Sequence, residues 1–436
     1  MEAHVEDRRA FGMASGTVVL VVGTLGGAYM VSQALRNSIG VIAPNLAAEL
    51  ALSAAEIGLL SSAFFMAFAA AQVPLGVCLD RFGPKACMLV CSGIAVIGAL
   101  WFAVATTPLG LVGARALLGL GSSCYLMAPL AFYARRFPPS RFGLFTGIQL
   151  GLGTLGTIFA TAPLAWSAAA VGWRATFVLI AAAMALAGVL LALVVPGEPA
   201  TADASKPTET LRESIAGTLH ALRTPSVGAL FLMQMSAYSS FVLVAGLWGG
   251  PYLTHIYGFG LQERGDLLLL TAAGQSAGSL AWGPLGRLFG HKTPVLIGSA
   301  LTVLGLLVPA VVGKLPSTAL VVWLGTFGLI SAYTALLVAH GKTLFPPALV
   351  GRGMTLLNIG TMVGVFVSQA ITGAIIDLFP APGGAYPLEA YRIVFAAQAL
   401  WLAGTMIPYL WADDRRRSLF SNQINELITR WATRRR

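Results

Sequence analysis

The chain has 436 residues, of which 57% are apolar and only 10% are charged, with a mean hydropathy of +0.79 and a net charge of +10. Because a soluble domain carries about 25% charged residues, this composition excludes an ordinary water-soluble globule and indicates that lipid is the main solvent. The positive charge predicts attraction to anionic lipid at one membrane face, and nothing in the pattern points to nucleic acid.

Charge-free stretches predict the transmembrane helices in chain order. A bilayer core about 30 Å thick needs roughly 20 apolar residues in a helix, since a spanning backbone must satisfy its own hydrogen bonds. We therefore expect an all-α polytopic membrane protein with twelve transmembrane helices. The twelve runs of 19 or more residues without Asp, Glu, Lys or Arg are 10–35, 57–79, 86–114, 116–134, 142–173, 175–197, 224–262, 267–286, 293–313, 315–341, 353–376 and 393–412.

The distribution of lysine and arginine predicts the orientation in the inner or plasma membrane. With the N-terminus inside, 21 of the 27 basic residues fall on the cytoplasmic side. We therefore expect both termini in the cytoplasm. Residues 1–13 are too polar and too short for a signal peptide, so we also expect the first span to be an uncleaved anchor.

One long polar stretch inside the chain, at 196–224, divides the spans into six and six. Its Pro, Thr, Ala and mixed charges are typical of a linker. We predict an N-terminal six-helix bundle at 1–195, a cytoplasmic linker at 196–224, a C-terminal six-helix bundle at 225–412 and a cytoplasmic tail at 413–436. An amphipathic helix on the inner leaflet is predicted in the tail, with disorder as the alternative. Its apolar face would consist of Phe420, Ile424, Leu427, Ile428 and Trp431.

A basic glycine loop occurs twice, as GVCLDRFGPK at 76–85 and as GPLGRLFGHK at 283–292. In both copies two glycines stand seven residues apart and a lysine ends the motif. FPPSRFG at 137–143 is similarly repeated as FPPALVGRG at 345–353. Two repeated halves with a binding cavity between them at mid-membrane are typical of transporters.

These motifs resemble the major facilitator superfamily, over the whole chain and in the order expected for it. The first loop resembles the signature between helices 2 and 3, and the second resembles its degenerate copy between helices 8 and 9. RALLGLG at 115–121 resembles the fourth-helix pattern, and GWRATF at 172–177 a common start of helix 6. The resemblance implies the major facilitator fold and secondary transport of a small molecule by alternating access. We expect a monomer surrounded by membrane lipids, with no cofactor.

The signature loop predicts a conformational latch between the two halves at the cytoplasmic end. Glycines would let helix ends approach closely, and the Asp80 carboxylate can accept hydrogen bonds from neighbouring helix ends or arginines. Positive-inside topology alone is the simpler alternative, but it does not explain the acid. The residues assigned to the latch are Gly76, Asp80, Arg81, Gly83, Lys85, Arg115, Arg287 and Lys292.

Arg36 is the charge in the middle of helix 1. An arginine there costs at least about 2.5–3.5 kcal/mol, which implies a function or a fixed partner. Tyr29, Gln33 and Arg36 fall on one helical face. LRNSIGVIAP resembles helix 1 of the organophosphate antiporters and anion:cation symporters, where an arginine eight residues before a proline binds the substrate's anionic group; Asn37 also matches. The resemblance implies that Arg36 grips a carboxylate or phosphate. An arginine paired with helix carbonyls is the alternative.

The chain departs from those families at two positions. Leu35 stands where the symporters usually have an aspartate for proton coupling, and Leu243 aligns where the organophosphate antiporters have an arginine in helix 7. No Asp or Glu lies deep in any predicted span. Driven transport would then need substrate protonation, a counter-substrate, or a coupling ion bound by other residues.

Other polar and aromatic residues complete the predicted substrate site, although each could instead bond to a neighbouring helix. The histidines and cysteines show no arrangement for catalysis or for binding a metal, so neither site is predicted. We predict a transporter of an organic anion and not an enzyme. An exporter of drugs or siderophore-like amphiphiles and a transporter-like sensor without flux are the alternatives. The further substrate-site residues are Tyr125, Gln149, Gln234, Tyr238, Trp248, Gln275, Tyr333, Asn358 and Gln369.

Overall fold

The computed structural model describes residues 15–197, 210–346 and 349–413. Within these ranges the chain is almost entirely helical and contains no strand. The predicted amphipathic helix of the tail lies outside the described residues.

The helices of the first half follow one another through short connections. They are α2 (Ser15–Asn37), α3 (Ile39–Leu50), α4 (Ala54–Val104), α5 (Pro108–Ser122), α6 (Met127–Arg136), α7 (Pro139–Phe159) and α8 (Ala162–Val194). A linker helix, α9 (Leu211–His220), and a short 3-10 turn, η1 (Ala221–Arg223), come next.

The second half begins with a helix that contains a π-turn. Its elements are α10 (Val227–Leu243), η2 (Val244–Trp248), α11 (Gly249–Tyr257), α12 (Leu261–Phe289), α13 (Lys292–Val312), α14 (Ser317–Ser331), α15 (Thr334–Leu344), α16 (Val350–Asp377), the 3-10 turn η4 (Pro382–Gly384) and α17 (Leu388–Tyr409).

Ten helical stretches are long and apolar enough to cross a membrane. One of them, α4, is bent at Gly83, where φ is +77°, so it contains two spans. The 29-residue α12 is also long enough to cross a bilayer. Counting the two arms of α4 separately and adding α12 gives twelve spans, so the expected all-α, twelve-span architecture is confirmed.

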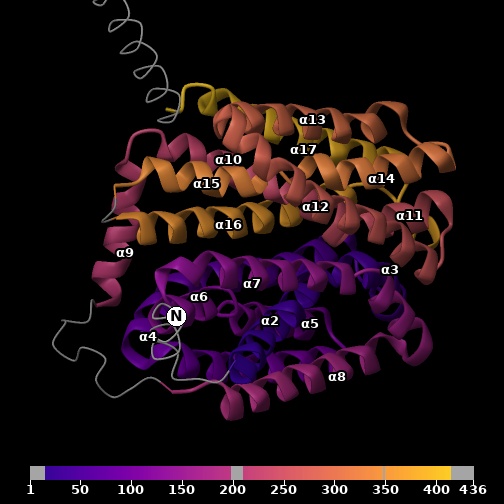
Figure 1. Cartoon of the computed structure of the whole chain (residues 1–436). Coiled ribbons are helices and arrows are strands. Elements are labelled where there is room, and N and C mark those ends of the chain that lie inside the picture. Colours follow the sequence, from indigo (N-terminus) through magenta and orange to yellow (C-terminus); the bar gives the residue numbers. More distant parts are fainter. Residues whose placement is uncertain (1–14, 198–209, 347–348, 414–436) are drawn as a thin grey trace, which may run out of the picture.

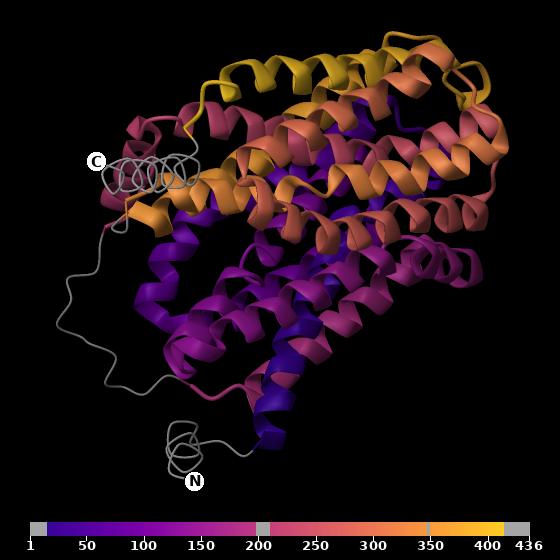
Figure 2. The same ribbon diagram turned by 45° about the horizontal axis from the view of Figure 1, so that its top comes forward.

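The two halves lie side by side, with α2–α8 in one group and α10–α17 in the other (Figure 1). The same separation is visible after the molecule is turned by 45° (Figure 2). The linker helix α9 lies at one end of both groups and contacts α4 and α16. We call this the linker end, and the opposite end, where α3 and α11 lie, the far end.

At the far end the backbones of the two halves touch. A methyl group added at Gly40 would collide with the backbone of Ala245 and Gly246, and one at Gly250 with the carbonyl oxygen of Gly40. One added at Gly58 would lie 2.5 Å from the carbonyl oxygen of Gln369. Glycine therefore allows the close helix contact that seals this end.

Two polar contacts reinforce this seal. The buried guanidinium of Arg264, at the start of α12, donates to Asn45 of α3 and to the Thr254 hydroxyl of α11, the latter at 2.7 Å. The Tyr386 hydroxyl accepts from the backbone N–H of Ala54 at 2.9 Å. Both Arg264–Asn45 and Tyr386–Ala54 join the first half to the second.

Toward the linker end, several glycines of α7 and α12 make no such close contact. Methyl groups added at Gly143, Gly147 and Gly151 of α7 would meet no atom within 4 Å, and the same holds for Gly283 of α12. The structure is therefore closed at the far end, while these faces of α7 and α12 are open.

Candidate functional site

Helix 1 is broken where the candidate anion-binding residue lies. Its first part, α2, ends at Asn37, and α3 starts at Ile39 and contains Pro44. Proline has no backbone N–H to donate to the preceding turn, so it weakens the helix around the break. Arg36 lies in the last turn of α2, near the middle of the combined 15–50 helix.

The Arg36 side chain is buried, with 7% of its surface exposed. Its guanidinium carbon lies 4.8 Å from the centre of the Phe68 ring on α4. Its Nε has no hydrogen-bond partner among the described residues. A guanidinium that stacks on an aromatic face keeps its N–H edge for a planar anion. The arrangement thus provides an oriented cation within the span that forms no ion pair with a carboxylate of the described residues.

Two tyrosines accompany this arginine. Tyr29 of α2 is buried and lies within electrostatic range of both Arg36 and Tyr238 of α10. Because α10 belongs to the second half, Tyr238 brings that half to the Arg36 region. The structure therefore gathers three of the predicted residues, Arg36, Tyr29 and Tyr238, around the boundary between the halves.

Several predicted amides are buried with unsatisfied atoms among the described residues. Gln33 Oε1, Asn37 Oδ1 and Gln234 Oε1 accept no hydrogen bond, and neither amide atom of Gln369 has a partner. A buried polar group without a partner costs roughly 1–3 kcal/mol. These buried amide atoms are therefore available to bond a ligand or a bound water.

Other predicted residues bond within their own half instead. Gln149 accepts from the Tyr133 hydroxyl and donates to the carbonyls of Leu25 and Tyr125. The Tyr125 hydroxyl lies 2.7 Å from Ser92 Oγ. In this conformation Gln149 and Tyr125 act as links between helices, which was the alternative for each.

Three of the four further predicted residues have defined neighbours. Trp248 donates to Thr372 Oγ1 at 2.8 Å. Asn358 crosses the boundary between the halves and donates to Gln72 Oε1 at 3.0 Å. Tyr333 packs on Trp282 inside the second half, and Gln275 is half-buried on α12. The hydrogen bond from Asn358 to Gln72 joins the two halves.

The two glycine loops share a backbone conformation at their second glycine. Gly83 and Gly290 both have φ +77°, a left-handed conformation that favours glycine. By contrast, a methyl group at Gly76 or Gly283 would meet nothing within 4 Å. The expectation that glycines here allow close helix approach is therefore corrected: the second glycine of each loop is needed for the turn, and the first lies in open space.

The charged residues of the first loop contact their own half. Asp80, 79% exposed, pairs with Arg135 at 3.3 Å, and Lys85 donates to the carbonyl of Ala192 at 2.8 Å. Arg81 lies over the ring of its neighbour Phe82. In the second loop Lys292 donates to the carbonyl of Ala412 at 2.7 Å, and Arg287 occupies the last turn of α12.

The structure separates Arg115 from these loops. Its side chain is fully buried and donates to the carbonyl of Leu35 at 2.8 Å, while its guanidinium lies 4.8 Å from the centre of the Phe64 ring. Leu35 directly precedes Arg36 at the break of helix 1. Arg115 is thus placed to hold the broken helix, because it satisfies a carbonyl beside the break.

Sequence reasoning missed the aromatic pair on α4. Phe64 and Phe68 stack on each other at 6.3 Å, and each carries one arginine, Arg115 and Arg36 respectively. Their spacing of four residues places them on one helical face, which the sequence does show. The pairing with two arginines from other helices required the packing of helices 1, 2 and 4.

A family model matches each half of the chain separately. The model of the Major Facilitator Superfamily matches residues 25–250 and 230–434. The probable sulfoacetate transporter SauU of Cupriavidus necator is 29% identical over 37% of this chain and 38% of its own length. The probable nitrate/nitrite transporter NarK2 of Mycobacterium tuberculosis is 25% identical over 52% of this chain and 56% of its own. The chain thus matches less than two thirds of each of these relatives.

Solved structures share the fold. A bacterial homologue of the human lysosomal transporter Spinster, inward-facing and occupied, has a TM-score of 0.74 and 18% identity, covering 91% of this chain and 97% of that one. The nucleoside transporter NupG has a TM-score of 0.72 and 16% identity, covering 90% and 100%. These likenesses confirm the fold implied by the sequence motifs. Since the family model covers nearly the whole chain, the protein belongs to the Major Facilitator Superfamily.

Proposed function

We propose that this protein is a secondary transporter that moves a small organic anion across the inner or plasma membrane by alternating access. The observation that carries the proposal is the buried Arg36, which stacks on Phe68 and has no ion-pair partner among the described residues. A buried charge without a counter-ion is costly, and an anionic substrate would neutralise it.

The chemistry of the relatives supports an anion. Their names refer to sulfoacetate and nitrate/nitrite, and a further relative, the hexuronate transporter of Bacillus subtilis, is 27% identical over 33% of this chain and 34% of its own length. All of these solutes carry a planar or tetrahedral anionic group that a guanidinium can hold with two hydrogen bonds.

The protein would cross the membrane in one orientation, as two helix bundles. The excess of lysine and arginine on one side of the predicted spans supports cytoplasmic termini and a cytoplasmic linker end. The units are bundles at 1–195 and 225–412, with the sealed far end outside and the candidate site between them. The protein would act as a monomer, and a counter-substrate or a coupling ion would drive the transport.

A thermal-shift measurement on the purified protein tests the substrate class. We expect an organic anion such as sulfoacetate or a hexuronate to raise the apparent melting temperature, because a ligand of the folded state stabilises it. The hexose that corresponds to the hexuronate is the matched uncharged control. If the hexose stabilises the protein and none of the anions does, the proposal of an anionic substrate is wrong.

Phe68 should orient the anion-binding guanidinium. Replacing Phe68 by leucine removes a cation–π contact worth about 0.5–2 kcal/mol, so the Kd for the stabilising anion should rise roughly two- to thirtyfold. Phe68→Tyr keeps the aromatic face and should bind nearly as the wild type does. Titration calorimetry on both variants measures the effect, and equal affinities for the leucine variant and the wild type would contradict this role.

Asp80→Asn should slow transport while leaving substrate affinity unchanged, because Asp80 lies in the linker-end loop and pairs with Arg135. An exposed pair contributes at most about 1 kcal/mol, so we expect the rate to fall by up to about fivefold. Asp80→Glu, which keeps the charge, is the control. Proteoliposome flux at saturating anion gives the rate; wild-type flux in Asp80→Asn would remove the latch from the account.

A further inference from the structure

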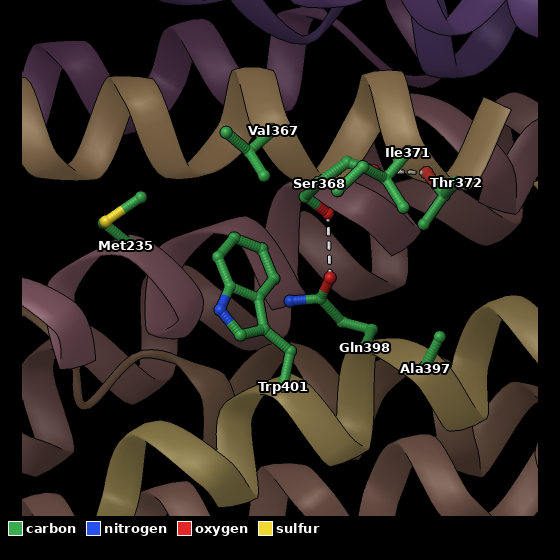
Figure 3. A pocket seen from close by; sticks show the side chains of 8 residues that line it. All are labelled: Met235, Val367, Ser368, Ile371, Thr372, Ala397, Gln398 and Trp401. Atoms are coloured by element: carbon green, nitrogen blue, oxygen red, sulfur yellow. Dashed lines mark hydrogen bonds between the residues drawn. The ribbon is translucent and has the colours of Figure 1, made fainter. Parts of the chain in front are cut away.

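A cavity of about 310 Å³ lies in the second half, between α10, α16 and α17. Figure 3 shows Trp401 and Met235 at one side and Ser368, Thr372 and Gln398 along another. The remaining lining residues are Val367, Ile371 and Ala397. The lining includes none of the residues of the predicted substrate set, Arg36 among them.

The cavity lies at the depth of the hydrocarbon core. Gln398 and Ala397 lie near the middle of α17, and Val367 and Ser368 lie well inside α16; both helices are candidate membrane spans. Ile371 at the rim is 54% exposed. Since most of the lining is apolar, a cavity at this depth in a membrane-spanning protein suits lipid chains better than bulk water.

The hydroxyl and amide groups of the lining are already bonded. Ser368 donates to Gln398 Oε1 at 2.8 Å, and Gln398 Nε2 donates to the hydroxyls of Ser239 and Ser240, both at 3.0 Å. Thr372 accepts from Trp248 and donates to the carbonyl of Ser368 at 2.6 Å. Among the described residues, the Trp401 indole N–H is the lining donor without a hydrogen bond, and most of the remaining lining is apolar, so an apolar occupant fits the cavity best.

The same hydrogen bonds connect the cavity to the π-turn of helix 7. Ser239 and Ser240, bonded to Gln398, lie just before η2, and Trp248, bonded to Thr372, is its last residue. The π-turn in turn contacts helix 1, where Gly40 lies against Ala245 and Gly246. Both ends of the turn that seals the far end are thus fixed by residues that line the cavity.

We propose that this cavity binds an acyl chain of a membrane phospholipid, and that an occupied cavity stabilises the closed far end through the π-turn. The occupant would contact Trp401, Met235 and Ile371 by dispersion and apolar burial. It would limit the movement of α16 and α17 against α10 and so hold the hydrogen bonds to Ser239, Ser240 and Trp248. Opening of the far end would require that these bonds rearrange.

The first test measures occupancy. The protein is placed in nanodiscs of phosphatidylcholine whose chains are brominated near their middle, and tryptophan quenching is compared with that in unbrominated lipid. The difference between wild type and Trp401→Phe gives the signal of Trp401 among the nine tryptophans. Ala397→Phe, which fills the cavity, should lower this signal about twofold or more, because the chain is displaced from van der Waals contact. Ala397→Leu is the milder second variant.

Leu400→Phe is the matched control, since Leu400 lies on the same helix, is 70% exposed and does not line the cavity. It adds the same ring without filling the cavity, so quenching of Trp401 should stay at the wild-type value. If Ala397→Phe and Ala397→Leu are quenched like Leu400→Phe, Trp401 senses only the general lipid surroundings and the proposed binding site is wrong.

The second test measures the connection to the π-turn. Hydrogen exchange of the peptide that contains 244–252 should slow about fivefold in Ala397→Phe, since the filled cavity opposes local opening. Leu400→Phe should exchange like the wild type. Unchanged exchange in Ala397→Phe, together with reduced quenching, would overturn the coupling. Neither test uses a transported substrate, so its outcome is independent of the proposed anion transport.

Discussion

Arg36→Lys should weaken binding of the stabilising anion roughly ten- to hundred-fold, because a charge-assisted contact worth about 1.5–3 kcal/mol is lost. Lysine keeps the positive charge but loses the planar fork that matches a carboxylate, sulfonate or nitrate. It also loses the flat surface that lies on Phe68. Arg36→Ala should bind the anion more weakly still.

The control for this prediction is a pair of ligands, one charged and one neutral, measured on both proteins after their melting temperatures have been compared. The neutral ligand should bind poorly to the wild type and lose little more in Arg36→Lys. A purely structural arginine predicts another pattern: low stability of both variants and equal losses for both ligands. That pattern would remove Arg36 from the substrate site.

Gly250→Val should slow transport strongly, because a side chain at this position collides with the Gly40 carbonyl when the far end is closed. Overpacking costs about 1–3 kcal/mol, which would shift the balance away from the closed far end by roughly five- to hundred-fold. Alternating access requires both end states, so flux should fall by a similar factor.

Gly147→Val is the matched control, since a methyl group at Gly147 meets no atom within 4 Å. State populations can be measured by labelling a cysteine introduced at the buried Ala54 of the far end, after the four native cysteines have been replaced. Labelling should rise in Gly250→Val and not in Gly147→Val. Unchanged labelling and wild-type flux in Gly250→Val would show that the far-end seal is not part of the cycle.

The fold could be predicted from the sequence because lipid imposes a simple rule. A spanning helix needs a long apolar run, and this chain has twelve of them with repeated loops between the halves. The position of Arg36 in the middle of helix 1 followed from the same rule. In the structure, Arg36 lies at the break between α2 and α3. The position of Pro44 in the sequence did not show where this break falls.

The division of the polar residues could not be predicted in this way. Gln149 and Gln369 look equivalent in the sequence, as single amides within apolar helices. The first has three partners in its own half, and the second has none among the described residues. Whether a buried amide is bonded or left without a partner depends on the carbonyls and hydroxyls that helix packing brings near it. These groups come from distant parts of the chain.

The glycine loops show a similar limit. Their spacing was visible, but the reason for each glycine was not: Gly83 and Gly290 adopt positive φ, whereas a methyl group added at Gly76 would meet no atom within 4 Å. Arg115 is another example. A sequence motif assigned it to the loops, whereas in the structure it donates a hydrogen bond to the carbonyl of Leu35 in helix 1. Contacts between helices decide such roles.

Counterflow in proteoliposomes tests the central claim most directly. Vesicles that contain the purified protein are loaded with sulfoacetate or a hexuronate, and uptake of the same labelled solute is measured for wild type and Arg36→Gln. The account predicts saturable accumulation of at least one anion by the wild type, none of its uncharged analogue, and loss of accumulation in Arg36→Gln. Accumulation of the uncharged analogue by both proteins, with no uptake of any anion, would contradict it.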